Sequence, residues 1–405
     1  MENNFTKYLN YVFILYAISL PLSRAGISFL SILIIILWIL EGNLKEKIKI
    51  LLSYKFILFS IILTIYLFIS LAWSSSFTIH PISKLWYYFV MFAICTSVKQ
   101  KYIKYIIKAF VLSMLVSEVI SYGIFFKLWT FSHGSPSDPT PFMNHLEYSI
   151  FLAFTASLLL SEIFLSNDKK TKIFYGIFFM TVSTNLFLTG GRTGQIAYII
   201  SLSLLFVANI KHKLLAVVIG FVCLSAILTF EYNISKTFKS RADSAYCDLK
   251  NVIQNNNYGG SWGLRLSTWV VSAKILEKNP IFGTGIADLK KDYKTYIGKD
   301  KILNIHDFSA IMTGGYHNDF LEATAGGGLI ACILFIIIFF KLCFVKINDK
   351  NIHNLKIAIL SIFIFSLVSD NFLRLQFSEN LFIIFVGIIL AQKRLEKERI
   401  INEKI

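Results

Sequence analysis

The sequence has 405 residues, of which 55% are hydrophobic, 16% aromatic and only 16% charged. A typical globular chain carries about 25% charged residues, and here the apolar residues come in long blocks. This composition excludes the soluble globular, disordered, fibrous and disulfide-rich classes, and it predicts an all-α polytopic membrane protein. The net charge is +16. Because membrane proteins concentrate Lys and Arg in their cytoplasmic loops, we interpret this charge as an orientation signal and not as a nucleic-acid footprint.

Apolar stretches recur along the whole chain, and a membrane-spanning helix needs about 20 mostly apolar residues. On that rule the sequence predicts about twelve transmembrane helices, with one large periplasmic loop between the ninth and the tenth. The predicted spans are residues 8–22, 25–40, 56–73, 84–98, 105–126, 146–166, 172–190, 193–209, 213–230, 316–343, 355–372 and 378–392. The first span could be misread as a signal peptide. No small-x-small cleavage site follows it and a second span begins at once, so we expect it to remain in the mature protein.

Basic residues fall mainly on one side of this plan. With a cytoplasmic N-terminus, the predicted inner loops and the C-terminal tail collect clusters of lysine and arginine. The short predicted outer loops hold little beyond Arg24, Lys127, Arg192 and Arg374. The positive-inside rule then places both termini in the cytoplasm.

This topology divides the chain into four parts. They are nine spans over 1–230, a periplasmic loop with amphipathic helices over 231–315, three spans over 316–392 and a basic cytoplasmic tail over 393–405. Within the loop, residues 263–278 have the pattern of an amphipathic helix, with an apolar side formed by Leu266, Trp269, Val270 and Ala273. Asn279-Pro280 ends that pattern, and the glycines of IFGTGI mark a turn.

Two arginines in the predicted outer segments have the chemistry to hold a phosphate. Arg192 stands among three glycines in TGGRTG, and Arg265 stands at the start of the amphipathic helix. A guanidinium can grip a phosphate by two parallel hydrogen bonds, and neighbouring glycines allow a close approach of the backbone. Each has a simpler alternative. Arg192 could instead lie at the membrane interface, with its guanidinium extended to the lipid headgroups. For Arg265, the local pattern alone favours a solvated position on the protein surface.

A histidine and an aspartate at predicted outer helix ends are candidates for acid–base chemistry. His317 opens a predicted span in GGYHNDFLEATAGGG and is followed by Asn318. A neutral imidazole there could remove a proton from a hydroxyl; the alternative is a histidine that anchors a helix end. Asp370 could orient a histidine or pair with an arginine, and Arg374 could simply neutralise it.

Two further patterns are weaker. Gly283-Thr284-Gly285 is a fragment of a glycine-rich phosphate loop without the preceding strand or the following Lys-Ser/Thr. His306-Asp307 could be combined with His317 as a metal cluster, but the spacing fits no known ligand set. We therefore predict no metal and no cofactor.

Three of these stretches, in this order and on the same predicted side of the membrane, resemble the O-antigen ligase family. That family groups WaaL-type ligases with O-antigen polymerases. The stretches are TGGRTGQIAY, GLRLSTWVVSAKILEKNPIFGTGI and HNDFLEATAGGGLIA. The last fits the ligase pattern at His317, Asn318 and Gly328. The family pattern of Arg, three residues, then Leu is not met at Arg265, where Trp269 takes the fourth place.

The resemblance implies a metal-independent, inverting glycosyltransferase in the bacterial inner membrane, with its active site facing the periplasm. It would move O-antigen or a related glycan from undecaprenyl diphosphate to the lipid A-core oligosaccharide. By the same resemblance, Arg192 and Arg265 would bind the diphosphate, His317 would activate the acceptor hydroxyl, and Asp370 and Asn318 would support the site.

Two alternatives remain open at this point. An O-antigen polymerase would use the same donor, but polymerases of the family tend to carry arginine-rich motifs in two outer loops, and the segment 127–145 contains no arginine. A transporter for a polyprenyl-linked glycan is the alternative from a different class. Many transporters consist of related halves, and the twelve predicted spans do not show them.

Overall fold

The computed structural model describes residues 4–78, 83–131, 133–234, 236–296 and 315–403. Within these ranges the regular structure is helical, apart from isolated β-bridges in the segment between Phe131 and Asp138. A helix covers each of the twelve predicted spans. These helices are α1 (Asn4–Ser19), α2 (Arg24–Leu40), α4 (Lys55–Ile69), α5 (Tyr88–Ser97), α6 (Gln100–Phe125), α7 (His145–Leu165), α8 (Lys169–Leu188), α9 (Arg192–Asn209), α10 (Lys213–Ile234), α15 (Asp319–Cys343), α16 (Lys350–Ser369) and α17 (Gln376–Asn402).

Several of these helices have the length and composition of membrane spans. Among the described residues, five segments meet this criterion: Lys55–Ala72 and the helices α7, α8, α15 and α16. The number rises to six if α2 and the short helix α3 (Leu44–Ser53), bent by 113° between them, form one broken span. The all-α membrane class is thereby confirmed, whereas the count of twelve spans stays a prediction.

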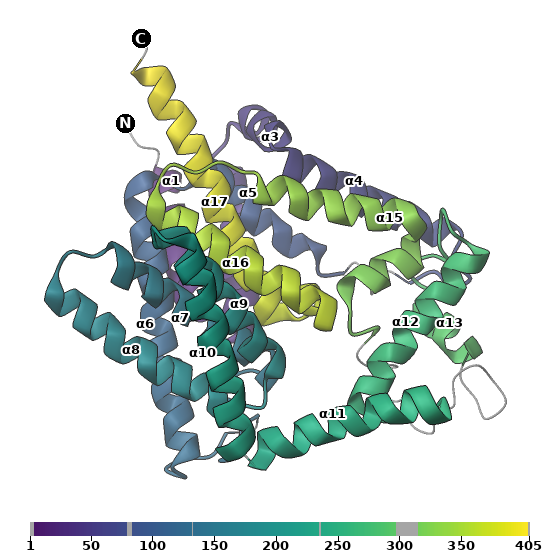
Figure 1. Ribbon diagram of the computed structural model, residues 1–405. Coiled ribbons are helices and arrows are strands. Elements are labelled where there is room, and N and C mark those ends of the chain that lie inside the picture. The colour runs from purple at the N-terminus through teal and green to yellow at the C-terminus, as the bar shows by residue number, and fades with distance from the viewer. Residues whose placement is uncertain (1–3, 79–82, 132, 235, 297–314, 404–405) are drawn as a thin grey trace.

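The helices pack around two members that are apolar on every side. In α7 and in the first half of α17 almost every residue is buried, which is the pattern of helices enclosed by others. Helices α8, α9 and α16 pack on α7, and α5 packs on α17. Helices α4 and α15 lie side by side at one edge of the molecule (Figure 1). The outward faces of this pair carry exposed apolar side chains, including Ile65, Phe68, Ile333 and Ile336.

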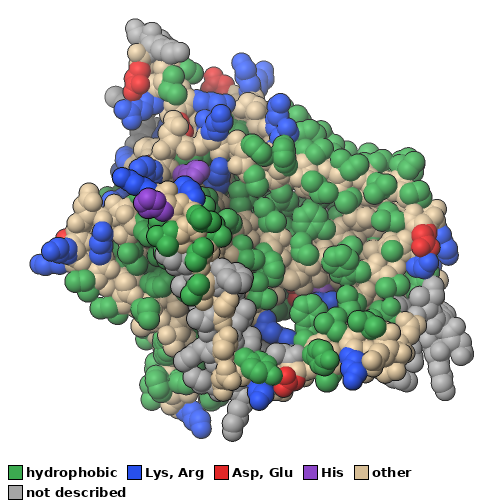
Figure 2. Space-filling view, in the orientation of Figure 1, with side chains coloured by type: hydrophobic (Ala, Val, Ile, Leu, Met, Phe, Trp, Pro, Cys, Tyr) green, Lys and Arg blue, Asp and Glu red, His purple; other side chains and the backbone are tan. Residues whose placement is uncertain are grey.

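The surface separates charge from apolar side chains. In Figure 2, hydrophobic side chains cover a broad area over α4 and α15, and Lys and Arg gather near the end of the molecule where both termini lie. The basic helix α3 and the last turns of α17 belong to that end. The arrangement suits a protein with a basic cytoplasmic side and a lipid-facing flank.

The predicted loop contains more helix than the sequence pattern indicated. Helix α10 continues to Ile234, past the predicted boundary at residue 230, and is followed by α11 (Lys236–Asn255), α12 (Gly260–Lys278) and α13 (Leu289–Tyr296). A small apolar core of its own, with Val271, Ile275 and Tyr293 among its members, joins α12, α13 and α15. The periplasmic position of this region stays a prediction.

The predicted apolar face of α12 is only partly correct. Leu266 and Val270 pack against the small apolar core, but Trp269 is 50% exposed and Ala273 is exposed. Small residues such as Gly263 and Ser267 are buried instead. The reason is close packing of small side chains. A Cβ at Gly263 would lie 2.6 Å from the backbone of Tyr258, in the turn that leads into α12. One turn further along the same side, the Ser267 hydroxyl forms a hydrogen bond with the Tyr293 hydroxyl of α13.

The glycine-rich turn after α12 docks on a break in α15. Gly328 has φ 65° and ψ −162°, which interrupts the helix. The amide of Thr284 donates to the Ala325 carbonyl at 3.1 Å, and the amide of Gly285 donates to the Gly326 carbonyl at 2.9 Å. A Cβ at Gly328 would lie 2.2 Å from a carbonyl oxygen of this turn. The glycines therefore fix the turn after α12 against α15. This packing explains the Gly283-Thr284-Gly285 pattern, so a phosphate-binding role is not needed to explain it.

Candidate functional site

His317 and Asp370 meet where α15 begins and α16 ends. The Nδ1 atom of His317 lies 3.0 Å from Oδ1 of Asp370. Because an ionised carboxylate can only accept a hydrogen bond, Nδ1 carries the hydrogen, and Nε2 of the neutral ring is left with a lone pair. The His317 side chain remains 22% exposed, whereas the Asp370 side chain is only 6% exposed. The pair therefore combines a partly exposed, oriented imidazole with a buried carboxylate.

Two asparagines fix the backbone around this histidine. The Asn318 side chain accepts a hydrogen bond from the Leu321 amide at 3.0 Å as the N-cap of α15, and its amide group donates to the Val368 carbonyl at 2.9 Å. The Asn318 backbone amide donates to Oδ1 of Asn371 at 2.8 Å. His317 itself has φ 51°, a left-handed conformation that costs a non-glycine residue about 1–3 kcal/mol. Asn318 and Asn371 connect the start of α15 to the end of α16 by hydrogen bonds and hold the histidine in that conformation.

Arg265 of α12 lies on the other oxygen of Asp370. Its NH2 atom is 3.6 Å from Asp370 Oδ2, and its side chain is 26% exposed. The Nε atom is buried, and within the described residues it has no hydrogen-bond partner. Arg265 is thus not the solvated surface residue that its local pattern favoured.

Asp370 is shared between a histidine and an arginine, and this sets its protonation. Burial raises the pKa of the carboxyl, but the hydrogen bond and charge of His317, the Asn371 amide and the Arg265 guanidinium lower it by more. The pKa of Asp370 therefore lies below its ordinary value. The carboxylate stays charged at neutral pH and can stabilise an imidazolium next to it.

Arg192 begins α9 beside the same junction. The hydroxyl of Ser369, the residue before Asp370, donates to the hydroxyl of Thr193, the residue after Arg192, at 3.2 Å. The glycines of TGGRTG allow this position, because a Cβ at Gly191 would lie 2.3 Å from the Ser149 side chain of α7. Arg192 is half-buried there. The structure thus places the TGGRTG loop against the turn that carries Asp370.

The suggestion that Arg374 neutralises Asp370 is wrong. Arg374 forms an ion pair with Glu322, and the Asn371 side chain donates to the same carboxylate. The Leu373 amide donates to Asp319 at 3.3 Å. Glu322 stands near His317 in the sequence, but its ion pair with Arg374 is not predictable from that position. Asn371 is a member of this junction that the sequence pattern does not indicate; its signal is its position directly after Asp370.

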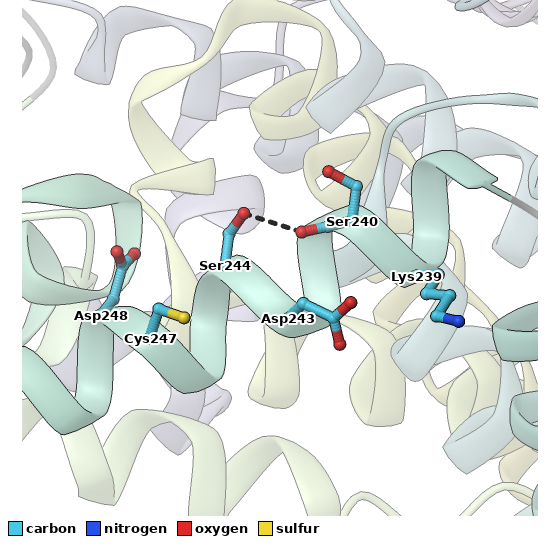
Figure 3. Close-up of a pocket in the computed structure, with 6 residues that line it drawn as sticks. All are labelled: Lys239, Ser240, Asp243, Ser244, Cys247 and Asp248. Carbon is cyan, nitrogen blue, oxygen red and sulfur yellow. Dashed lines mark hydrogen bonds between the residues drawn. The ribbon is translucent and has the colours of Figure 1, made fainter.

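A hollow of 560 Å³ on α11 is separate from this site (Figure 3). It is lined by six residues of that one helix, Lys239, Ser240, Asp243, Ser244, Cys247 and Asp248. None of the histidine, arginine or aspartate residues of the site contributes to it. His306 and Asp307, the other members of the suggested metal cluster, lie outside the described residues.

The comparisons with known proteins agree with this geometry. The fold and the site define an all-α membrane protein whose helix ends carry an arginine–aspartate–histidine arrangement. Residues 176–336, which contain Arg192, Arg265 and His317, match the family model described as O-antigen ligase. A protein of Haemophilus influenzae, described as uncharacterized, is 25% identical over 290 residues, which are 68% of this chain and 69% of that protein. The family match supports an enzyme for glycan transfer of the ligase or polymerase type, with a lipid-linked substrate in the membrane.

Proposed function

We propose that this protein is an O-antigen ligase. It would move O-antigen or a related glycan from undecaprenyl diphosphate to the lipid A-core oligosaccharide at the periplasmic face of the inner membrane. The observation that carries this proposal is the shared carboxylate of Asp370, which binds the candidate base His317 through one oxygen and the candidate phosphate ligand Arg265 through the other.

His317 acts on the acceptor. Its Nε2 atom takes the proton of the acceptor hydroxyl while that oxygen attacks the anomeric carbon of the donor sugar. The imidazolium that forms is stabilised by Asp370, whose lowered pKa keeps it ionised. His317 thus acts as the base, and the buried Asp370 orients its ring and stabilises its charged form.

Arg265 and Arg192 act on the donor. As the bond from the anomeric carbon to the phosphate oxygen breaks, its electron pair stays on the diphosphate, and fixed guanidinium groups stabilise the growing charge. The proton from the acceptor remains on His317 until it passes to solvent. Attack opposite the leaving group in one step inverts the anomeric centre. Metal-independent chemistry is the expectation, because the arginines supply the positive charge.

The predicted outer segment 127–145 favours a ligase over a polymerase. A polymerase must bind two chains that are both linked to the lipid diphosphate, and this segment contains no arginine that could bind the second one. The lipopolysaccharide of a strain that lacks the gene separates the candidates. A bare lipid A-core with long polymer left on the lipid carrier supports the ligase. A core capped by a single repeat unit contradicts it and indicates a polymerase. Lipid-linked glycan trapped in the cytoplasmic leaflet also contradicts it and indicates a transporter.

A further inference from the structure

An apolar cavity between α4, α5, α15 and α17 borders the described site, because Glu322 and Arg374 line it. A different cavity lies far from that site. It has a volume of 240 Å³ and is formed by α6, α7, α8 and the start of α16. Asn351 in its wall and Asp370 of the site stand at opposite ends of α16, about 28 Å apart at 1.5 Å per residue. This cavity is therefore separate from the chemistry proposed above.

Polar and charged residues line one end of this cavity. Glu162 stands in the last turn of α7, and Asn351 stands in the first turn of α16. These two helix ends are adjacent, because the Asn354 side chain donates to the Ser161 hydroxyl at 2.9 Å. Lys108 of α6 belongs to the same end, since its charge acts on Glu162. The predicted topology places this end at the cytoplasmic side of the membrane.

The remainder of the cavity is apolar and opens to the side of the helix bundle. Leu115, two turns beyond Lys108 on α6, and Phe178 of α8 line its inner part. From Lys108 to Leu115 the helix rises about 10 Å, which lies within one leaflet of a hydrocarbon core about 30 Å thick. Leu112 and Phe174 also line the cavity and are exposed, so it is open along the outer surface of α6 and α8. These dimensions suit part of one acyl chain in a single leaflet.

The two charged residues in the wall are not paired with each other. Within the described residues, neither the Lys108 ammonium nor the Glu162 carboxylate has a hydrogen-bond or ion-pair partner. The charges that act on Glu162 are those of Lys104 and Lys108, which are positive, and Asp349, which is negative. An ionisable residue in a membrane-spanning helix is costly without a partner. The polar end therefore presents unpaired charges of both signs to a ligand.

We infer that this cavity binds phosphatidylethanolamine, a phospholipid whose headgroup carries both a phosphate and a primary ammonium. Lys108 binds the phosphate, Glu162 accepts hydrogen bonds from the ammonium, and one acyl chain fills the apolar part between α6 and α8. An anionic phospholipid such as phosphatidylglycerol has a partner for Lys108 but brings its negative charge next to Glu162 and Asp349. Phosphatidylcholine has the same two charges, but its quaternary ammonium has no N–H to donate. Charge complementarity therefore selects the primary ammonium.

Lipid binding to the purified full-length protein tests this assignment. Native mass spectrometry measures the Kd for phosphatidylethanolamine, phosphatidylglycerol and phosphatidylcholine, all with identical oleoyl chains. The wild-type protein should bind phosphatidylethanolamine at least about tenfold more tightly than either of the other two lipids, which is the effect of one charge-assisted hydrogen bond. A second reading is the thermal unfolding midpoint, which phosphatidylethanolamine should raise more than the other lipids, because a ligand of the folded state stabilises it.

Three variants separate the parts of the cavity. Glu162→Gln should abolish the preference for phosphatidylethanolamine over phosphatidylglycerol. Lys108→Gln should weaken binding of both, because both contain the phosphate. Leu115→Trp fills the apolar part and should weaken binding of all three lipids. The matched controls are Glu46→Gln on α3 and Ile177→Trp on α8, which are exposed and outside the cavity, and both should bind as the wild type does.

Several results would overturn the assignment. Equal affinity of the wild-type protein for the three lipids excludes headgroup selection, and tighter binding of phosphatidylglycerol indicates a site for anionic lipids instead. A folded Glu162→Gln protein that keeps the full preference for phosphatidylethanolamine removes the carboxylate from the site.

A photoreactive phosphatidylethanolamine, with its reactive group on an acyl chain, gives a reading that needs no variant. It should label the wild-type protein on α6 or α8 near Leu115 or Phe178, and unlabelled phosphatidylethanolamine in excess should suppress the labelling. Labelling confined to other helices contradicts the assignment. None of these readings uses glycan transfer, so the lipid site and the proposed ligase function can fail independently of each other.

Discussion

The substitution Asp370→Asn tests the geometry of the site most selectively. It preserves the shape of a buried side chain and removes the charge that lies 3.0 Å from His317 Nδ1 and 3.6 Å from the Arg265 guanidinium. A hydrogen bond to a charged group contributes about 1.5–3 kcal/mol. If the imidazolium loses that much in the transition state, kcat falls about 10- to 150-fold at about 1.36 kcal/mol per factor of ten. An amide that turns its NH2 toward Nδ1 would leave the wrong tautomer and increase the loss toward about 10⁴-fold.

The assay is single-turnover transfer by purified protein in lipid nanodiscs, with the thermal unfolding midpoint as a check on folding. Asp288→Asn is the matched control. Asp288 is equally buried and accepts hydrogen bonds from the Ser75 amide and hydroxyl at 2.6 and 2.7 Å, but it belongs to the outer region without contact to His317. We expect Asp288→Asn to keep its rate per folded molecule. A folded Asp370→Asn protein within threefold of the wild-type rate would refute the role of the shared carboxylate.

The same variant has a predictable dependence on pH. The pKa of Asp370 is lowered in the folded protein relative to an unfolded value of about 3.9. Its contribution to stability is therefore fully present above that value and is lost as the pH falls through the folded pKa. The difference in unfolding midpoint between wild type and Asp370→Asn should therefore shrink as the pH falls below about 4. A difference that stays the same or grows below that pH would contradict the direction of the shift.

The remaining predictions concern binding, fold and topology. Arg265→Lys keeps the charge but loses the planar fork, so transfer should fall by about tenfold or more with normal accumulation; a rate near wild type would remove Arg265 from diphosphate binding. Gly328→Ala places a Cβ 2.2 Å from the Ile281 carbonyl oxygen at a residue whose φ is 65°. The protein should therefore lose at least about 1–2 kcal/mol of stability, measured as a lower unfolding midpoint. An unchanged midpoint would show that α15 does not need its break. Cys247 is exposed on α11, so an impermeant thiol reagent should label it in intact spheroplasts and should leave the buried Cys95 unlabelled; labelling of Cys247 only after lysis would reverse the predicted orientation.

The sequence predicts the helices well because apolar blocks of about 20 residues specify them locally. It also singles out His317, Asn318 and Asp370, which stand at the ends of predicted spans and which the structure brings together; ionisable residues at such positions are costly without a partner. Arg265 is the instructive case. Its neighbours in sequence suggest a surface helix, and only the docking of the following glycine turn on α15 brings it to Asp370.

Features that depend on tertiary pairing could not be predicted in this way. The buried side of α12 is set by Gly263 and Ser267, whose small size matters only once a neighbour is known. Arg374 stands four residues after Asp370 in the sequence, but in the fold it pairs with Glu322 of α15. The apolar cavity between α4, α5, α15 and α17 is built from separate parts of the chain, so no local pattern predicts it.

The most direct test of the account is single-turnover transfer by His317→Ala. The variant loses only the base, because the arginines that are assigned to the donor diphosphate stay in place. It should bind the lipid-linked donor with wild-type affinity and transfer its glycan to the lipid A-core about 10²- to 10⁴-fold more slowly, without inhibition of the wild-type enzyme by EDTA. Transfer by His317→Ala at a rate close to that of the wild type would contradict the assignment of the base, and with it the mechanism built on the shared carboxylate.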